Sequence, residues 1–450
     1  MGEHAEDLPV DNTDGFESED FSDGTASLTG PEFTSDAAPV APVAPADTQS
    51  MMSQPRPVPR ISIDCFCDGP DTGATVQRAA EDRRLSRTHT TVYMGGVTAA
   101  IDHYDSRATP NLIVVETRGD TSNLLVHLAK LAERCDANTK VIVIGAVNDI
   151  TLYRDLMREG VSDYLIAPMS PLQFIESVSS LYVDPDAAPI GKVIVFAGTK
   201  GGAGSSTVAH NVGWLIAEEI QDDVTIVDFD IAFGTAGLDF NQEPAQGVAD
   251  ALVAPERLDD VLLERLLVKC TDHLNVLTAP AMLDKDTDLD PSAFEAVLDV
   301  VRQSCPVVIV DLPHVWSAWA KQVLVAADEV VLVTTPDLAG LRNTKNLADL
   351  LVLARPNDNP PNIVLNQCGL PKRPEIPAKD FAEAIGRSVA AAVPFDATLF
   401  GTASNNGQML GELKSDAKPT EEMRDLAQLL TGRKAQPKQK SNVFSKLMGK

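Results

Sequence analysis

A glycine-rich loop between a buried strand and a helix constrains the fold of this chain most strongly. The loop runs from Gly198 to Thr207, after the apolar run Val193–Ala197 and before the helix-like stretch Val208–Ile220. Its glycines let backbone N–H groups turn toward one point, where the positive end of the helix dipole also lies. Such an arrangement suits a polyphosphate, so the sequence predicts a nucleotide site at the end of a buried strand.

The lysine of this loop stands in an unusual position. A Walker A loop ends in Gly-Lys-Ser/Thr, but here Ser205 follows Gly204, and the lysine of the loop, Lys200, precedes Gly201. The pattern Lys-Gly-Gly-x-Gly-x-Ser-Thr resembles the deviant Walker A loop of the MinD/ParA ATPases. In that superfamily the early lysine reaches across a dimer interface to the nucleotide of the partner subunit.

A later segment narrows the resemblance to one branch. The loss of the second lysine, together with the strings Phe395-Asp396 and Leu399–Met409, is similar to the TadZ/CpaE pilus-assembly proteins. The resemblance covers roughly Ser62–Gly432. It implies an ATP- and Mg²⁺-binding homodimer that localises and helps assemble the Flp (Tad) pilus machinery, often at a cell pole. The implied partners are the Tad pilus secretion ATPase and other components of that machinery.

Charge and hydropathy limit the partners and the compartment. The 450 residues carry a formal net charge of −28, which disfavours nucleic acid as a partner because phosphate neutralisation needs a basic face. No apolar stretch approaches the roughly 20 residues that span a bilayer. We therefore expect a cytoplasmic protein, or one that is peripheral at the inner membrane or a cell pole.

Composition shifts along the chain predict five segments. They are a disordered acidic tail (1–57), a receiver-like domain (58–184), a short linker (185–191), a MinD/ParA-like ATPase domain (192–432) and a basic tail (433–450). The acidic tail is interpreted as a solvated spacer, with partner binding as the alternative. The basic tail has an amphipathic pattern that suits peripheral contact with anionic lipid, and the alternative is a frayed terminus or a partner peptide.

The receiver-like domain is predicted from five alternations of strand and helix, which indicate a doubly wound parallel sheet. The expected strands are 61–67, 91–94, 112–117, 140–144 and 163–166, and the first expected helix is 74–85. Glu116 stands where a receiver carries its phospho-accepting aspartate, and Ala167 replaces the usual lysine before Pro168. A glutamate cannot form the aspartyl phosphate, so we predict a pseudo-receiver for docking or dimerisation, with a plain α/β spacer as the alternative.

The ATPase domain is predicted to hold a mostly parallel sheet, because its apolar runs are nearly continuous, as strands covered on both faces require. The expected strands are 193–197, 224–227, 274–277, 307–310, 330–334, 363–365 and 389–393. Helices are expected between them, notably 315–327 and 338–354. The fold class is therefore α/β, with a receiver-like domain followed by a MinD-like P-loop domain.

Three aspartates follow strands of this sheet, whose carboxyl ends meet at the edge where ligands bind. Asp228 and Asp230 end one strand with the same expected orientation, and Asp311 ends another. By resemblance, Asp311 is the Walker B residue that holds Mg²⁺ through water, with the Ser206 hydroxyl as a further ligand and Asp228 supporting the metal shell. Asp230 matches the residue that orients the attacking water. For each aspartate the alternative is a turn former or helix cap.

The remaining site residues are the nucleotide contacts. Asn366 matches the strand-end asparagine that hydrogen-bonds adenine in the family, and the alternative is a turn residue. The phosphates are expected on the loop itself, at Gly201, Gly202, Ala203, Gly204, Ser205, Ser206 and Thr207.

Lys200 and Asp230 are the predicted catalytic residues. Loss of one cation from the loop should cost several kcal/mol of transition-state stabilisation unless Lys200 of a second subunit replaces it. We therefore expect nucleotide binding linked to dimerisation, and weak ATP hydrolysis at best. The alternatives are a scaffold that binds ATP without hydrolysing it and a ParA-type DNA partitioner, which the acidity disfavours.

Overall fold

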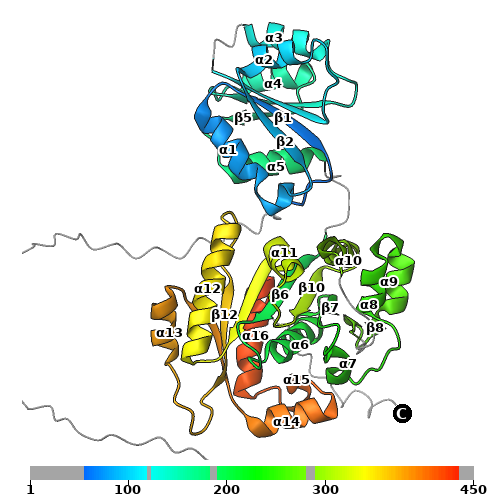
Figure 1. Ribbon diagram of the computed structural model, residues 1–450, viewed down its shortest axis with the longest axis vertical. Coiled ribbons are helices and arrows are strands. Elements are labelled where there is room, and N and C mark those ends of the chain that lie inside the picture. Colours follow the sequence, from blue (N-terminus) through cyan, green and yellow to red (C-terminus); the bar gives the residue numbers. More distant parts are fainter. Residues whose placement is uncertain (1–54, 119–122, 183–189, 280–288, 435–450) are drawn as a thin grey trace, which may run out of the picture. The chain divides into compact units, whose positions relative to one another are not determined.

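The computed structural model describes residues 55–118, 123–182, 190–279 and 289–434 (Figure 1). Most of the predicted acidic tail, linker and basic tail lies outside these residues, so the boundaries of the five predicted segments remain predictions. The described elements form two sheets, one of five strands and one of eight. None of the helices in the described ranges is long and apolar enough to cross a membrane.

The first sheet is parallel and has the strand order β2-β1-β3-β4-β5. Its strands are β1 (Ser62–Cys67), β2 (His89–Met94), β3 (Leu112–Thr117), β4 (Lys140–Gly145) and β5 (Asp163–Ile166). The helices between and after them are α1 (Pro70–Ala80), α2 (Gly96–His103), α3 (Leu124–Ala132), α4 (Ile150–Arg158) and α5 (Pro171–Tyr182). This order confirms the receiver-like, doubly wound class.

The first sheet has a hydrophobic core on each face, because successive side chains of a strand point to opposite faces of the sheet. Cys65 packs with Val76 of α1 and Phe174 of α5 on one face. Phe66 packs with Leu128 of α3 and other residues of α2 to α4 on the other face. Both faces are therefore covered by helices, as a parallel sheet requires.

The predicted helix 74–85 is wrong in its bounds. The helix α1 begins four residues earlier, with Pro70 in its first turn, where the missing N–H of proline costs nothing. It ends at Ala80, and a separate 3₁₀ turn, η1 (Arg83–Leu85), follows. The Asp82 side chain accepts the Arg84 N–H and so starts a new turn that the apolar periodicity did not reveal.

The second sheet has the order β13-β12-β11-β6-β10-β7-β9-β8 and is parallel except for β8, which runs antiparallel to β9. This confirms the predicted mostly parallel sheet. Its strands are β6 (Lys192–Gly198), β7 (Val224–Asp228), β8 (Val268–Lys269), β9 (Leu274–Leu277), β10 (Val307–Leu312), β11 (Glu329–Thr334), β12 (Asn362–Cys368) and β13 (Val389–Pro394).

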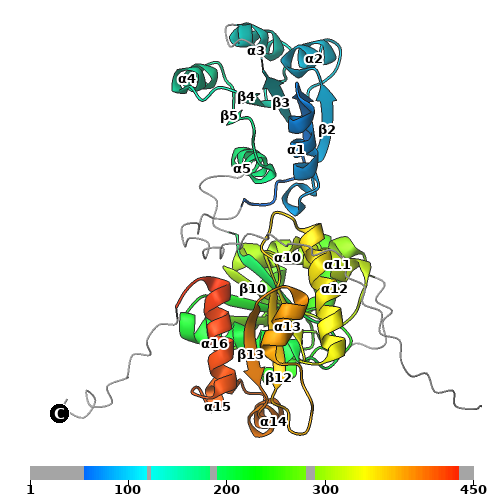
Figure 2. The same ribbon diagram turned by 90° about the vertical axis from the view of Figure 1, so that its left-hand side faces the viewer.

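Helices cover both faces of this sheet (Figure 2). On one face, α6 (Ser205–Leu215) and α16 (Lys418–Thr431) pack on Ile194 and Phe196 of β6. On the other, α10 (Pro291–Ser304), α11 (Ala318–Ala326) and α12 (Leu338–Ala354) pack with Val193 and Val195. The remaining elements are η3 (Ile216–Ile220), α7 (Ala236–Asp239), α8 (Val248–Val253), η4 (Pro255–Arg257), α9 (Asp260–Leu266), α13 (Ala378–Ile385), α14 (Ala397–Asn406) and α15 (Leu410–Leu413).

Side-chain caps explain where the helix predictions failed and where they succeeded. The predicted helix 338–354 is confirmed, because the Asp337 carboxylate accepts the Gly340 N–H and caps α12. The predicted helix 315–327 starts only at Ala318, since Ser317 is its N-cap. The helix after the loop starts earlier than Val208, at Ser205, and its last turn, η3, is a π-helix.

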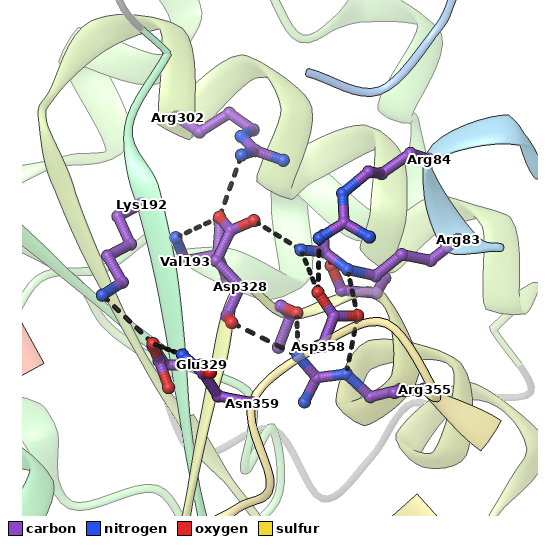
Figure 3. A network of polar contacts seen from close by, with 12 residues as sticks. Arg83, Arg84, Lys192, Val193, Arg302, Asp328, Glu329, Arg355, Asp358 and Asn359 are labelled. Carbon is purple, nitrogen blue, oxygen red and sulfur yellow. Dashed lines mark hydrogen bonds and ion pairs between the residues drawn. The ribbon is translucent and has the colours of Figure 1, made fainter. Parts of the chain in front are cut away.

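A buried polar cluster lies where β6 and β11 begin (Figure 3). The Asp328 carboxylate accepts hydrogen bonds from the Val193 N–H at 2.8 Å and from Arg302 at 3.0 Å. Asp358, which follows α12, pairs with Arg355 and with Arg83 and Arg84 of η1. These contacts satisfy charges that burial would otherwise make costly.

Candidate functional site

The glycine-rich loop joins β6 to α6. It follows an inner strand of the sheet, because β6 lies between β11 and β10 (Figure 1). Gly202 and Gly204 adopt left-handed conformations, with φ of 74° and 82°. Gly204 is the N-cap of α6 and offers no side chain to the first N–H groups of the helix. Those donors, together with the helix dipole, could receive a polyphosphate, and phosphate binding at this loop remains a prediction.

The end of β12 holds the loop from one side. The Asn366 side chain donates to the Ala203 carbonyl at 2.9 Å and accepts the Gln367 N–H at 2.8 Å. Gln367 donates in turn to the Gly202 carbonyl at 2.9 Å. The structure thus places Asn366 against the loop backbone, and adenine recognition by this residue remains a prediction. Sequence reasoning missed Gln367, and its position next to Asn366 was the only signal for it.

Lys200 is held on the other side of the loop by a residue that sequence reasoning missed. Its ammonium lies 2.7 Å from the Asp337 carboxylate, which also accepts the Thr335 hydroxyl at 2.7 Å. Asp337 follows β11, at the same edge of the sheet as Asp311. The strand-end argument that selected the other aspartates could therefore have selected it too.

Partial burial works against the charge of Asp337, but hydrogen bonds from Lys200, the Gly340 N–H and Thr335 outweigh it and lower the pKa of Asp337 to about 2. Because the folded-state pKa is depressed, the contribution of this carboxylate to stability is present above its usual value of 3.8. That contribution is lost as the pH falls toward about 2.

We expect Asp337 to stay ionised at pH 3 in the wild-type protein and to become largely protonated there in the Lys200→Ala variant. A carboxyl ¹³C NMR titration measures both. Lys345→Ala, which removes an exposed ion pair with Asp349 on α12, is the control and should leave the midpoint unchanged. Identical Asp337 midpoints in all three proteins would contradict the ion pair.

Two of the predicted acids lie side by side on neighbouring strands of the sheet. Asp311 of β10 and Asp228 of β7 are partners in the strand register and are almost fully buried. Burial, followed by repulsion from Asp311, raises the pKa of Asp228 to about 7. The two oxygens of Asp228 accept the N–H groups of Asp230 and Ala236, so this residue organises the loop after β7.

Asp230 lies two residues beyond the end of β7, so it is not part of the strand, contrary to the expectation from the sequence. The strand ends at Asp228, so the alternation of side chains stops there. Asp230 accepts the Phe233 N–H at 3.1 Å and lies half-buried in the turn, where burial raises its pKa. Its role with an attacking water remains a prediction.

The donor set at this edge fits a hydrated Mg²⁺ that nucleotide phosphates also bind. One Asp311 oxygen, Oδ1, is buried without a hydrogen-bond partner. Ser206 lies in the first turn of α6, beside the loop. Mg²⁺ keeps several waters and usually takes only one or two protein oxygens next to phosphates. The described residues contain no group of three or more His, Cys, Asp or Glu side chains that could hold a metal ion.

Glu116, at the end of β3 in the first sheet, is buried and fully engaged. Its carboxylate accepts the N–H groups of Asp68 and Gly69, at 2.8 and 2.9 Å, the Thr72 hydroxyl at 2.8 Å, and Arg118 at 2.7 Å. Burial opposes the charge, but these donors outweigh it and lower the pKa of Glu116. The contacts leave this position with a structural role, in line with the predicted pseudo-receiver.

Comparison with known proteins identifies the class. A protein-family model described as "AAA domain" matches residues 191–360. The septum site-determining protein MinD of Bacillus subtilis (strain 168) is 28% identical over 185 residues, which are 40% of this chain and 65% of that protein. The chain thus spans just under two thirds of this curated relative. It belongs to the MinD/ParA superfamily of P-loop ATPases, as the displaced lysine indicated.

Within this superfamily the chain is related to the CpaE pilus assembly proteins. It is 50% identical to CpaE from Caulobacter crescentus CB15, with coverage of 29% of this chain and 98% of that structure and a TM-score of 0.28. It is 40% identical to a putative CpaE2 from Sinorhizobium meliloti 1021, with coverage of 27% and 99% and a TM-score of 0.27.

Proposed function

We propose that this protein binds ATP and Mg²⁺ at the loop Gly198–Thr207, dimerises when it does so, and helps to localise and assemble a Flp/Tad-type pilus machinery at a cell pole. The observation that carries the proposal is the charge arrangement of the loop. Ser205 replaces the second lysine, and Lys200 is paired with Asp337 at 2.7 Å within its own chain.

In this proposal the backbone of one subunit binds the phosphates of the nucleotide but does not neutralise their charge. The first N–H groups of α6 can receive phosphate oxygens, and Ser206 and Asp311 would hold the Mg²⁺, with Asp228 supporting the loop beside them. If Mg²⁺ is bound there, it would neutralise part of the phosphate charge. Asp230 would orient a water, and Asn366 would stay near the base.

A second copy of the chain completes the site in this proposal. Lys200 is half-exposed, and its partner Asp337 is equally accessible, so exchange of this ion pair for a phosphate contact is inexpensive. A lysine from the partner subunit then supplies the cation that Ser205 cannot. ATP therefore favours the dimer, and turnover in a monomer is slow.

The pilus role rests on the relationship to the CpaE proteins, whose names describe pilus assembly. Partners in this proposal are the pilus secretion ATPase and other machinery components. The basic segment 433–450 would add a peripheral membrane contact at the inner membrane or pole. Nucleic acid is not an expected partner, because the net charge is −28.

A scaffold that holds ATP without hydrolysing it is the second candidate. Ser205 favours it, because the loop lacks one cation that phosphoryl transfer normally uses. The two candidates share binding and dimerisation and differ only in phosphate release.

The test is sedimentation of the full-length protein without nucleotide, with ADP and with ATP, each with Mg²⁺, with phosphate release measured on the same samples. We expect ATP to raise the dimer fraction of the wild-type protein. Lys200→Ala should weaken ATP-linked dimerisation about tenfold or more, a loss of roughly 1.4 kcal/mol. Asp230→Ala should keep the dimer and lower phosphate release.

Lys269→Ala is the matched control, since this exposed lysine lies in the same fold and pairs with Asp272 on the surface. It should behave as wild type. Equal dimer fractions with and without ATP, in both wild type and Lys200→Ala, would overturn the proposed linkage. ATP-dependent dimers without any phosphate release would select the scaffold.

A further inference from the structure

A buried histidine beneath the candidate site was not among the predicted residues. His210 lies on α6, the helix that the glycine-rich loop begins, and is 0% exposed. Its Nδ1 lies within hydrogen-bond distance of a carboxylate oxygen of Asp239, at 2.7 Å. Its Nε2 lies 3.4 Å from Oδ2 of Asp311, which is within ion-pair distance but makes no hydrogen bond. The imidazole therefore stands between two acids that belong to different elements.

The two acids connect the Mg²⁺ position with the segment that follows β7. Asp311 is the next-to-last residue of β10, and its other oxygen, Oδ1, has no hydrogen-bond partner. Asp239 is the last residue of α7 and also accepts the Thr235 hydroxyl at 3.2 Å. The ring of Phe240 lies beside the imidazole, at 5.8 Å between centroids, and keeps it in place.

Charge favours the same arrangement. Burial alone would lower the pKa of His210, but Asp239 and Asp311 outweigh burial and raise it to about 10. Asp228, the register partner of Asp311, also faces this cluster, and Asp230 lies nearby in the turn. The imidazole stands between Asp311 and Asp239, so its removal would leave these two acids without this group between them.

We propose that His210 is a positioning residue whose Nε2 attracts Oδ2 of Asp311 across the 3.4 Å ion pair, and so leaves Oδ1 available to the Mg²⁺ that the site would hold. Its Nδ1 contact with Asp239 fixes the plane of the ring, which makes α7 part of the support for Asp311. This inference rests on the proposed nucleotide and Mg²⁺ site. The role that it gives to His210 is to support the contribution that Mg²⁺ makes to nucleotide affinity.

Two substitutions separate the contacts of His210. An asparagine side chain can reach the position of Nδ1 and keep the Asp239 contact, whereas a glutamine can reach toward the position of Nε2 and keep the Asp311 contact. The measurement is ADP binding to the full-length protein by calorimetry, with Mg²⁺ and with EDTA. The ratio of the two dissociation constants is the contribution of Mg²⁺, and a merely structural role would not change it selectively.

We expect His210→Asn to lower this ratio about tenfold, as the loss of one charge-assisted contact predicts, and to leave ADP binding in EDTA near the wild-type value. His210→Gln should keep most of the ratio. Asp239→Asn, which leaves the histidine in place but weakens the fixation of its ring, should lower the ratio by a smaller factor. His273→Asn is the control, because His273 is a half-exposed histidine of the same fold, paired with Asp223.

A wild-type ratio in His210→Asn would overturn this inference. If that variant does not fold, a wild-type ratio in Asp239→Asn would overturn it in the same way, and a lowered ratio would support it. A wild-type protein that binds no ADP in either buffer would instead overturn the proposed function.

Discussion

Replacement of Asp358 by asparagine is expected to lower the free energy of unfolding by about 3–5 kcal/mol, the usual cost of removing one partner from a buried ionic cluster. The Asp358 side chain is 1% exposed and pairs with Arg84 at 2.5 Å, Arg83 at 3.0 Å and Arg355 at 3.5 Å (Figure 3). Asparagine has nearly the same shape but replaces one acceptor oxygen with an N–H₂ donor, so the expected loss combines the lost charge with the lost hydrogen bonds of that oxygen.

The reason for the large effect is that the guanidinium groups stay buried when the carboxylate charge is removed. Arg83 and Arg355 have almost no exposed side-chain surface, and burial lowers the pKa of Arg355. Burial also disfavours the charge of Asp358, but the three arginines outweigh it and lower its pKa. Each charge in the cluster is therefore stabilised by the opposite charges around it, and neutralising any one of them should lower the stability of the fold.

Urea unfolding followed by tryptophan fluorescence measures this effect in a defined part of the chain. The chain has three tryptophans, Trp214, Trp316 and Trp319, and all belong to the fold of the second sheet. Asp272→Asn is the matched control, because Asp272 is 92% exposed in its pair with Lys269 and should change stability by less than about 0.5 kcal/mol. An Asp358→Asn protein within about 1 kcal/mol of wild type would show that water already screens the cluster.

The Gly204→Ala variant is expected to lose about a hundredfold or more in nucleotide affinity. A Cβ atom at this position would lie 2.4 Å from the Asn366 side-chain nitrogen, which no van der Waals contact permits. Alanine would also carry the cost of a φ of 82°, about 1–2 kcal/mol. Overpacking of this kind costs a further 1–3 kcal/mol or so. The loop would shift to escape the clash, and nucleotide binding would have to restore it.

The loop provides its own control. Gly202 has a similar φ of 74°, but a Cβ there would meet nothing within 4 Å, so Gly202→Ala carries the backbone cost without the clash. We expect its affinity to fall about tenfold, in line with the backbone term alone. The double variant Gly204→Ala with Asn366→Gly should recover part of the loss. Equal affinities for the two single variants would contradict the role of Asn366 as a support of the loop.

Local patterns in the sequence were sufficient for much of the fold. The glycine-rich loop after Val193–Ala197 lies where it was predicted, and the helix 338–354 has the predicted bounds because its cap, Asp337, adjoins it in sequence. Errors occurred where a cap or a bound lies outside the apolar pattern. Pro70 makes α1 begin earlier than predicted, and the Ser317 cap makes α11 begin later than predicted. Neither residue belongs to the helical pattern of apolar residues from which the bounds were predicted.

In the candidate site, too, some features were predicted from local sequence patterns and others were not. Asp228 and Asp311 were predicted, because each directly follows an apolar run and parallel strands end at one edge. The contacts of Lys200 with Asp337 and of Asn366 with Ala203 were not predicted, since they join residues 137 and 163 positions apart. Periodicity and spacing carry no information about such pairs.

The sequence by itself determined the α/β class, the glycine-rich loop and the absence of its second lysine, because each depends on residues that are neighbours in the chain. Only the tertiary structure decided which polar groups hold that loop. The strand order places β11 and β10 beside β6, with β12 beyond β11, and this brings Asp337, Asp311 and Asn366 around residues 198–207. The physical reason is that a hydrogen bond or an ion pair depends on distance in space, which the order of strands sets and the spacing of residues does not.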